Sequence, residues 1–235
     1  MRFQHLHRLR APADTSTRFE MRSLHTSFLV LFTAVFAVAC STLEYKVRET
    51  FGQQKRELLV DRVETAKDSQ EEAKEQFVSA LERFKALTGF EGGDVEEKYE
   101  EIQAEYDKCA ERAAAVSERI KAVDDVAHAL FDEWEDELDD YASDALRRDS
   151  ERKLEQTRRS YDRLIEVMRN AESRMNPVLA TLNDQVLYLK HNLNARAIAS
   201  IGGVSAELER DIDVLIADME RAINDAARFI EQMRE

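Results

Sequence analysis

The residues best suited to chemistry in this sequence form an acidic run from Asp132 to Asp140, in which seven of nine side chains are carboxylic acids. Carboxylate oxygens are ligands that Ca²⁺ and Mg²⁺ prefer, so the run could bind a divalent cation. It lacks the glycine and the alternating ligand spacing of a calcium loop, and a helix would point its carboxylates to different sides. We therefore favour charge pairing with the basic residues that follow in the chain. These are Arg147, Arg148, Arg152, Lys153, Arg158 and Arg159.

A second polar group interrupts an otherwise apolar stretch near the end of the chain, and it consists of His191, Asn192, Asn194 and Arg196. Buried polar groups need internal hydrogen bonds. No Cys or second His stands near His191 at metal-ligand spacing, so we interpret it as a core or interface residue rather than as a ligand or catalytic base. We predict that the four residues belong to a surface that contacts a protein partner or a second copy of the chain.

The sequence contains no Gly-rich phosphate loop, no G-x-S-x-G, no H-E-x-x-H and no C-x-x-C. We therefore expect no catalytic residues, no metal, no cofactor and no enzymatic activity. The net charge of −14 at pH 7 argues against nucleic acid as a ligand, because proteins bind it by neutralising phosphates with Lys and Arg.

Residues 1–39 have the features of a leader with a lipoprotein-type signal peptide, and Met21 is a candidate for the true start. The apolar run Phe28–Ala39 is 12 residues long, shorter than the roughly 20 residues that span a bilayer. The tetrapeptide 37–40 resembles a bacterial lipobox, and this implies cleavage before Cys40 and a diacylglycerol on its sulfur. Cys109 would then be the remaining thiol. We predict a small buried core residue there, with an intermolecular bridge or redox sensing as the alternative.

Residues 40–235 are predicted to form a single elongated domain of about four long helices. The whole chain has 6 Gly, 2 Pro and 35% charged residues, a composition that argues against a β-sandwich or barrel. The glycines separate four segments with helical periodicity, for which we predict helices at about 44–88, 94–141, 145–201 and 205–234.

The second segment has the clearest pattern, because its apolar residues recur at alternating gaps of four and three, as in a coiled-coil seam. This stripe is Val95, Tyr99, Ile102, Tyr106, Cys109, Ala113, Val116, Ile120, Val123, Ala127, Leu130 and Trp134. The first segment has a matching stripe that Gln70 interrupts, and such polar residues often fix register at a cost in stability. We predict an all-α, antiparallel coiled-coil-like bundle, in which the fourth segment covers the apolar half of the third, Met175–Ile201.

Four stretches carry a resemblance to a known family: 61–68, 71–77, 130–135 and 185–197. They resemble an uncharacterised bacterial family of predicted lipoproteins, domain of unknown function 2959, over about residues 40–235. The last stretch is the most specific part. The resemblance implies a lipoprotein of helical structure and implies no known activity, ligand or residue role.

These observations predict an envelope lipoprotein that acts as a coiled-coil structural or protein-interaction module. Its partners would be a membrane, through the N-terminal lipid, and a protein or a second copy of the chain. We expect it to face the periplasm. Ser41, in place of the Asp that retains some lipoproteins in the inner membrane, favours the outer membrane by analogy. The alternative is an envelope module that binds a divalent cation or an apolar ligand.

Overall fold

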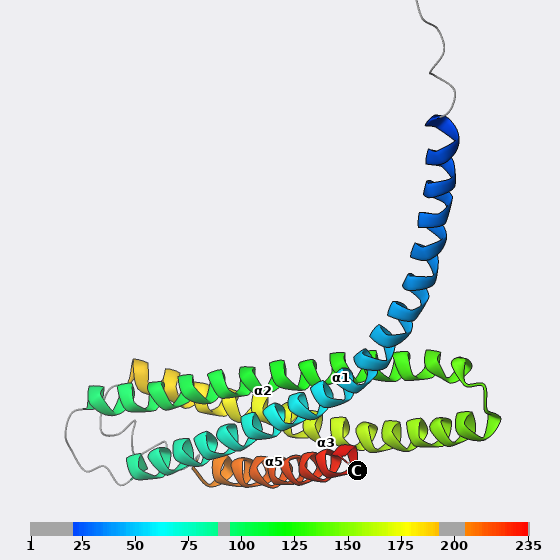
Figure 1. The fold of residues 1–235 in the computed structure, drawn as a ribbon. Coiled ribbons are helices and arrows are strands. Elements are labelled where there is room, and N and C mark those ends of the chain that lie inside the picture. The colour runs from blue at the N-terminus through cyan, green and yellow to red at the C-terminus, as the bar shows by residue number, and fades with distance from the viewer. Residues whose placement is uncertain (1–20, 89–94, 193–204, 235) are drawn as a thin grey trace, which may run out of the picture. The chain divides into compact units, whose positions relative to one another are not determined.

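The computed structural model describes residues 21–88, 95–192 and 205–234, with the backbone alone for 21–53, 88 and 205. Within these ranges it contains four α-helices, a short 3-10 helix and no strand, so the predicted all-α fold class is confirmed (Figure 1). The elements are α1 (Met21–Thr88), α2 (Val95–Glu137), η1 (Leu138–Asp140), α3 (Asp144–His191) and α5 (Ser205–Arg234).

The chain divides into two compact units, residues 1–50 and 51–235. In the first unit, residues 21–50 are helical and belong to α1. The predicted leader and Cys40 lie in this unit, and the side chain of Cys40 is outside the described part of the chain. Among the described residues, no helix has both the length and the apolar character needed to cross a membrane.

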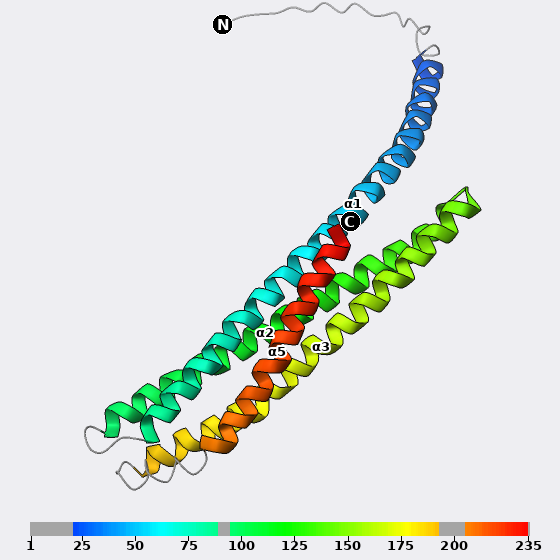
Figure 2. The ribbon, with the colours of Figure 1, turned by 90° about the horizontal axis from the view of Figure 1, so that it is seen from below.

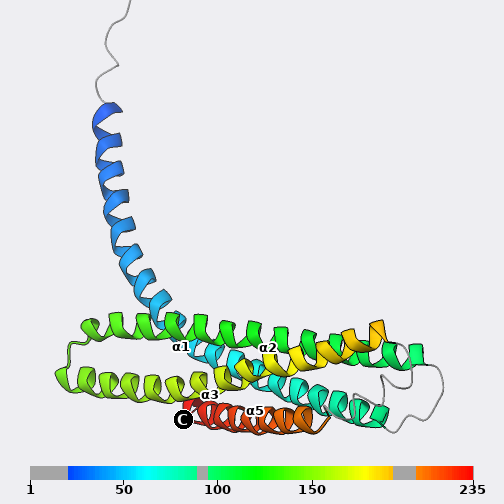
Figure 3. The same ribbon diagram turned by 180° about the vertical axis from the view of Figure 1, so that it is seen from behind.

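The second unit is a bundle built on the α2–α3 hairpin, whose helices run side by side from the turn at η1 (Figure 3). Helix α5 packs against α3 (Figure 2). Helix α1 contacts α2 through a hydrogen bond of 2.7 Å from Gln76 Nε2 to Glu105 Oε2. It contacts α5 through a hydrogen bond of 3.0 Å from Arg56 Nε to the carbonyl oxygen of Met233. At 1.5 Å per residue, the 48 residues of α3 span about 70 Å.

The predicted stripes form one continuous hydrophobic core in this unit. In α2, Ile120 and Val123 are buried between the helices, as the four–three spacing predicts. The first, third and fourth segments also turn their stripes inward. Their buried members are Leu59, Val63, Ala66, Gln70, Ala73, Phe77, Ala80, Phe84, Leu87, Leu154, Tyr161, Ile165, Met168, Met175, Leu208, Ile212, Leu215, Met219, Ala222, Ala226, Phe229 and Met233.

Four members of the α2 stripe are only partly buried, namely Val95, Tyr99, Tyr106 and Trp134, and beside Tyr106 it is Glu105 that is buried. The Glu105 carboxylate accepts hydrogen bonds from Gln76, from Ser79 and from Lys108, the last at 2.9 Å. Burial by itself raises the pKa of Glu105, but the hydrogen bonds from Lys108 and Gln76 outweigh it and the net pKa is lowered. The carboxylate therefore stays charged at a seam position because α1 and α2 both supply donors.

The turn between α2 and α3 is held by side-chain hydrogen bonds. Ser143 caps α3, and its Oγ accepts a hydrogen bond of 3.4 Å from the backbone N–H of Leu146. Ser150 Oγ accepts a hydrogen bond of 2.8 Å from the indole Nε1 of Trp134 and one of 3.3 Å from the Tyr141 hydroxyl. These contacts tie the end of α2 to the beginning of α3.

The apolar half of the third segment is covered on one face rather than on most sides. Val178, Leu182 and Val186 are buried, whereas Leu187 and Tyr188 are each 43% exposed. Helix α3 ends at His191, and the remainder of the predicted helix, 193–201, lies outside the described residues. Helix α5 covers the inner face of α3, and the described residues leave the opposite face open near its end.

Gln70 is wholly buried on the α1 seam, and its amide has no hydrogen-bond partner among the described residues. A buried polar group without a partner costs about 1–3 kcal/mol. The Gln70→Leu variant should therefore raise the free energy of unfolding of the bundle by about 1–3 kcal/mol in urea titrations. Gln70→Ala is the control, because it removes the amide without filling the space. If Gln70→Leu is less stable than the wild type, the buried amide has partners and the premise is wrong.

Candidate functional site

The predicted surface residues lie at the end of α3, where the described part of the chain includes two of the four. His191 is exposed, so a position in the core is excluded. Asn192 caps the helix: its backbone N–H bonds to the carbonyl of Leu189, and its side-chain Nδ2 donates to the carbonyl of Tyr188 at 3.0 Å. Asn194 and Arg196 lie outside the described residues. The interface role of the group stays a prediction.

Leu187 and Tyr188 extend this surface with apolar atoms, and we call the four residues Leu187, Tyr188, His191 and Asn192 the α3 end surface. Its large side chains are among the few exposed apolar ones in the described chain. Tyrosine and apolar side chains grouped in this way are typical of protein contact sites.

Of the six basic residues predicted to pair with the acidic run 132–140, Arg147 and Arg158 do so. Three others pair with acids of their own helix α3, namely Arg152 and Lys153 with Asp149 and Arg159 with Glu155. Arg158 Nη2 lies 2.8 Å from Glu135 Oε2, and Arg147 pairs with Asp139 at 3.7 Å. Lys55 of α1 pairs with Glu133 at 3.1 Å, a contact that the sequence analysis did not predict. Within the described ranges, no group of three or more His, Cys, Asp or Glu side chains is arranged to hold a metal ion.

A polar cluster that sequence reasoning missed lies between α2 and α3, and we name it the Asp124 cluster. Tyr161 donates a hydrogen bond of 2.5 Å to Asp124 Oδ1, and Arg169 donates one of 2.8 Å to Asp124 Oδ2. His128 Nδ1 lies 2.9 Å from the backbone oxygen of Asp124, and its ring meets the Tyr161 ring edge-on at 6.5 Å. Phe131 also packs edge-on against Tyr161, at 5.5 Å.

The Asp124 cluster is built to hold two helices together rather than to transfer protons. Burial, and then the hydrogen bond to Asp124, raise the pKa of Tyr161 above its usual range, so the phenol stays protonated. Both carboxylate oxygens of Asp124 accept hydrogen bonds from α3. The cluster therefore connects α2 and α3 by charge-assisted hydrogen bonds, which are stronger than neutral ones.

Cys109 is the thiol that the sequence analysis placed in the core, and its side chain is fully buried. Burial raises the pKa of this thiol to about 12, and its Sγ lies 3.7 Å from the backbone oxygen of Gln76. A protonated, buried thiol is a poor nucleophile. The environment of Cys109 therefore supports a role in core packing rather than in an intermolecular bridge or in redox sensing.

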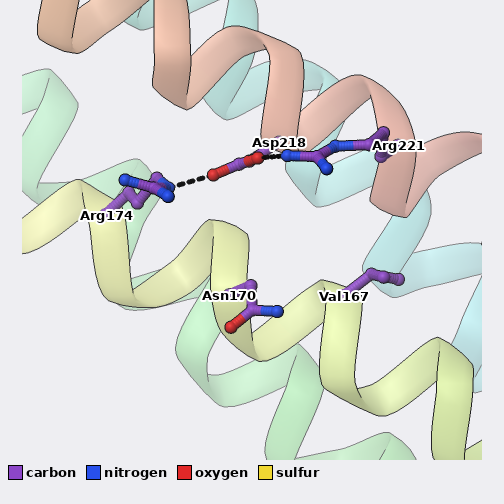
Figure 4. A pocket seen from close by; sticks show the side chains of 5 residues that line it. All are labelled: Val167, Asn170, Arg174, Asp218 and Arg221. Carbon is purple, nitrogen blue, oxygen red and sulfur yellow. Dashed lines mark ion pairs between the residues drawn. The ribbon is translucent and has the colours of Figure 1, made fainter.

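A hollow of about 250 Å³ lies between α3 and α5, and we call it the α3–α5 hollow (Figure 4). It is lined by Val167, Asn170, Arg174, Asp218 and Arg221. Asp218 is only 4% exposed, and its carboxylate forms ion pairs with both arginines. Sequence reasoning missed this group. One usable signal was the position of Asp218 directly before Met219 on the α5 stripe, beside the buried face.

The tyrosine of the Asp124 cluster offers a direct test of the cluster's structural role. Tyr161→Phe should lower the free energy of unfolding by about 1.5–3 kcal/mol, the range for a hydrogen bond to a charged group. Because folding raises the pKa of Tyr161, the wild-type contribution is present below pH about 10 and is lost as the pH rises further. The variant should lack this alkaline loss in urea titrations at pH 8 to 11.

Tyr141→Phe is the matched control for that experiment, since Tyr141 is 41% exposed and its hydroxyl bond to Ser150 is longer, at 3.3 Å. It should change stability by less than about 0.5 kcal/mol. If the two substitutions lower the free energy of unfolding by the same amount, the Tyr161 hydrogen bond stabilises the fold no more than an exposed one does.

Comparison with known proteins places the chain in a family. No curated protein and no solved structure matches it. A family model described as "Protein of unknown function (DUF2959)" matches residues 44–233, which is most of the sequence and the whole of the helical core. This chain therefore belongs to the DUF2959 family of proteins of unknown function.

Proposed function

We propose that this protein is a membrane-tethered envelope lipoprotein whose helical bundle acts as a structural or protein-interaction module. The observation that carries the proposal is the core, to which all four helices contribute one continuous set of buried side chains. Polar contacts between the helices add to this core, as where Asp124 of α2 accepts from Tyr161 and Arg169 of α3. Such an arrangement supports a stiff scaffold, which acts through its surface.

The tether in this proposal is a diacylglycerol on Cys40. Its support is the leader pattern of residues 1–39, with the apolar run and the lipobox-like tetrapeptide 37–40. A lipid on the N-terminal cysteine would hold the bundle at a membrane surface, facing the periplasm. Ser41 favours the outer membrane by analogy with other lipoproteins.

The contact site in this proposal is the α3 end surface, together with Asn194 and Arg196 beyond it in sequence. Leu187 and Tyr188 expose apolar area there, and His191 and Asn192 add polar groups at the same helix end. A protein partner or a second copy of the chain would bury this apolar area, and this burial would favour association.

The two cysteines provide a matched test of the tether. Cys40→Ala should abolish incorporation of labelled palmitate and shift the protein from the membrane fraction to the soluble fraction. Cys109→Ala should leave labelling unchanged, because this buried thiol takes no part in lipidation. Fractionation followed by immunoblotting and fluorography measures both properties. Labelling that survives Cys40→Ala would contradict the lipid attachment site.

The contact site can be tested in cells with a photo-crosslinking amino acid at position 188. Crosslinks of one defined mass should form from position 188 and should disappear when Leu187→Asp is added, because a charge in the contact would have to be desolvated. The control probe at position 162 lies on the same helix, where Asp162 is exposed. Identical crosslinks from positions 162 and 188 would contradict a contact site at the end of α3.

A further inference from the structure

Among the residues that line the α3–α5 hollow, positive charge exceeds negative charge. Asp218 is a buried carboxylate, and a charge removed from water must be paired, or it costs several kcal/mol. One arginine would neutralise it, yet Arg174 of α3 and Arg221 of α5 both form ion pairs with it. The lining therefore carries two positive charges and one negative charge.

Both guanidinium groups keep donors for another ligand. Arg174 uses its Nε on Asp218 Oδ2, and Arg221 uses its Nη2 on Asp218 Oδ1. A guanidinium has five N–H donors, so each arginine retains several after pairing. The two side chains are 52% and 71% exposed, which leaves their unused donors accessible from solvent.

Asp218 also fixes the positions of the two arginines. Figure 4 shows its carboxylate lying between them, with Arg174 on one side and Arg221 on the other. Free arginine side chains lose rotamer entropy when they bind a ligand, and a shared buried anchor reduces that cost before the ligand arrives. The hollow is thus preorganised at its charged side, while Asn170 adds an amide and Val167 an apolar wall.

We propose that the α3–α5 hollow binds a phosphate group beside Asp218, through the N–H donors of Arg174 and Arg221 that Asp218 does not use. A planar carboxylate matches the fork of one guanidinium, whereas a tetrahedral phosphate presents oxygens in several directions and can accept from two forks. The two guanidinium groups come from different helices and flank Asp218, so a tetrahedral group beside the carboxylate can accept from the remaining donors of both. The hollow, at about 250 Å³, has room for a phosphate with a small substituent.

The net charge of the chain, −14, opposes any anion at long range. Charges beyond about 8–10 Å are largely screened at physiological ionic strength, so the local charges of the hollow decide binding. Two sources could supply the group: free phosphate or phosphomonoesters in solution, and the headgroup of an anionic phospholipid. Their shared chemistry is the phosphate itself.

The first measurement is calorimetric titration of the full chain with inorganic phosphate at constant ionic strength. The wild type should bind saturably, and sulfate, which has the same shape, should compete. Arg221→Gln should weaken binding about tenfold, the loss typical of one charge-assisted hydrogen bond. Arg228→Gln is the matched control, because Arg228 is also on α5, also pairs with an aspartate three residues before it, and is 67% exposed. It should leave the affinity unchanged.

A second variant keeps the test decisive if Arg221→Gln weakens the fold. Asn170 is exposed and lies outside the ion pairs, so Asn170→Asp should preserve folding while its added negative charge abolishes phosphate binding. The proposal is overturned if the wild type shows no saturable binding. It is also overturned if Arg221→Gln and Arg228→Gln bind equally well, or if acetate competes as strongly as sulfate.

Flotation with phosphatidylcholine vesicles, with and without phosphatidic acid, distinguishes the two sources. The wild type and Arg221→Gln share the same N-terminal segment, so a difference between them reports the hollow alone. Greater binding of the wild type to vesicles with phosphatidic acid identifies the lipid headgroup as a source. Equal binding of the two, with calorimetric binding intact, supports free phosphate or a soluble phosphomonoester.

Discussion

The structure of residues 51–235 depends on one constraint, which is that each long helix has a single apolar face and must bury it against the others. Isolated helices are marginal in water even with favourable sequences, and tertiary packing of an amphipathic face supplies most of their stability. Here the four helices share one core. Small residues such as Ala66 and Ala127 and large ones such as Phe77 and Met168 are all buried in it, and together they fill the space between the helices.

The same constraint explains how polar residues are placed. Where an acid lies at the edge of an apolar face, a neighbouring helix supplies its donors. Glu105 receives them from α1 and from its own helix, Asp124 from α3, and Asp218 from α3 and its own helix. Gln70 is the exception, because it sits in the middle of its face and its amide has no partner among the described residues. A buried polar side chain at the edge of the apolar face of its helix therefore finds hydrogen-bond partners, whereas Gln70, in the middle of that face, finds none among the described residues.

Sequence periodicity was sufficient to predict which face of each helix is buried, because residues at four–three spacing share one face by the geometry of that helix alone. It correctly predicted Cys109, Ile120 and Val123 as core residues. It failed where the outcome depends on a neighbour in space. Tyr106 continues the α2 stripe by spacing, but Glu105 takes the buried position because Gln76 and Ser79 of α1 face it. The Asp124 cluster and the α3–α5 hollow were missed for this reason, since Asp124 bonds to Tyr161 and Arg169 of α3, and Asp218 of α5 pairs with Arg174 of α3.

Side chains fill the interior of this bundle, so a ligand or a partner would bind at its surface or at the edges of the contacts between helices. The charged contacts between the helices are of two kinds. At Asp124 the donors of Tyr161 and Arg169 use both carboxylate oxygens, and one positive charge meets one negative charge. At Asp218 the positive charge exceeds the negative charge, and the arginines reach solvent. Both oxygens of the buried Asp218 are paired, one with each arginine, so the two ion pairs satisfy the carboxylate and leave one positive charge unbalanced. That unbalanced positive charge is what distinguishes the proposed phosphate site from the contact at Asp124.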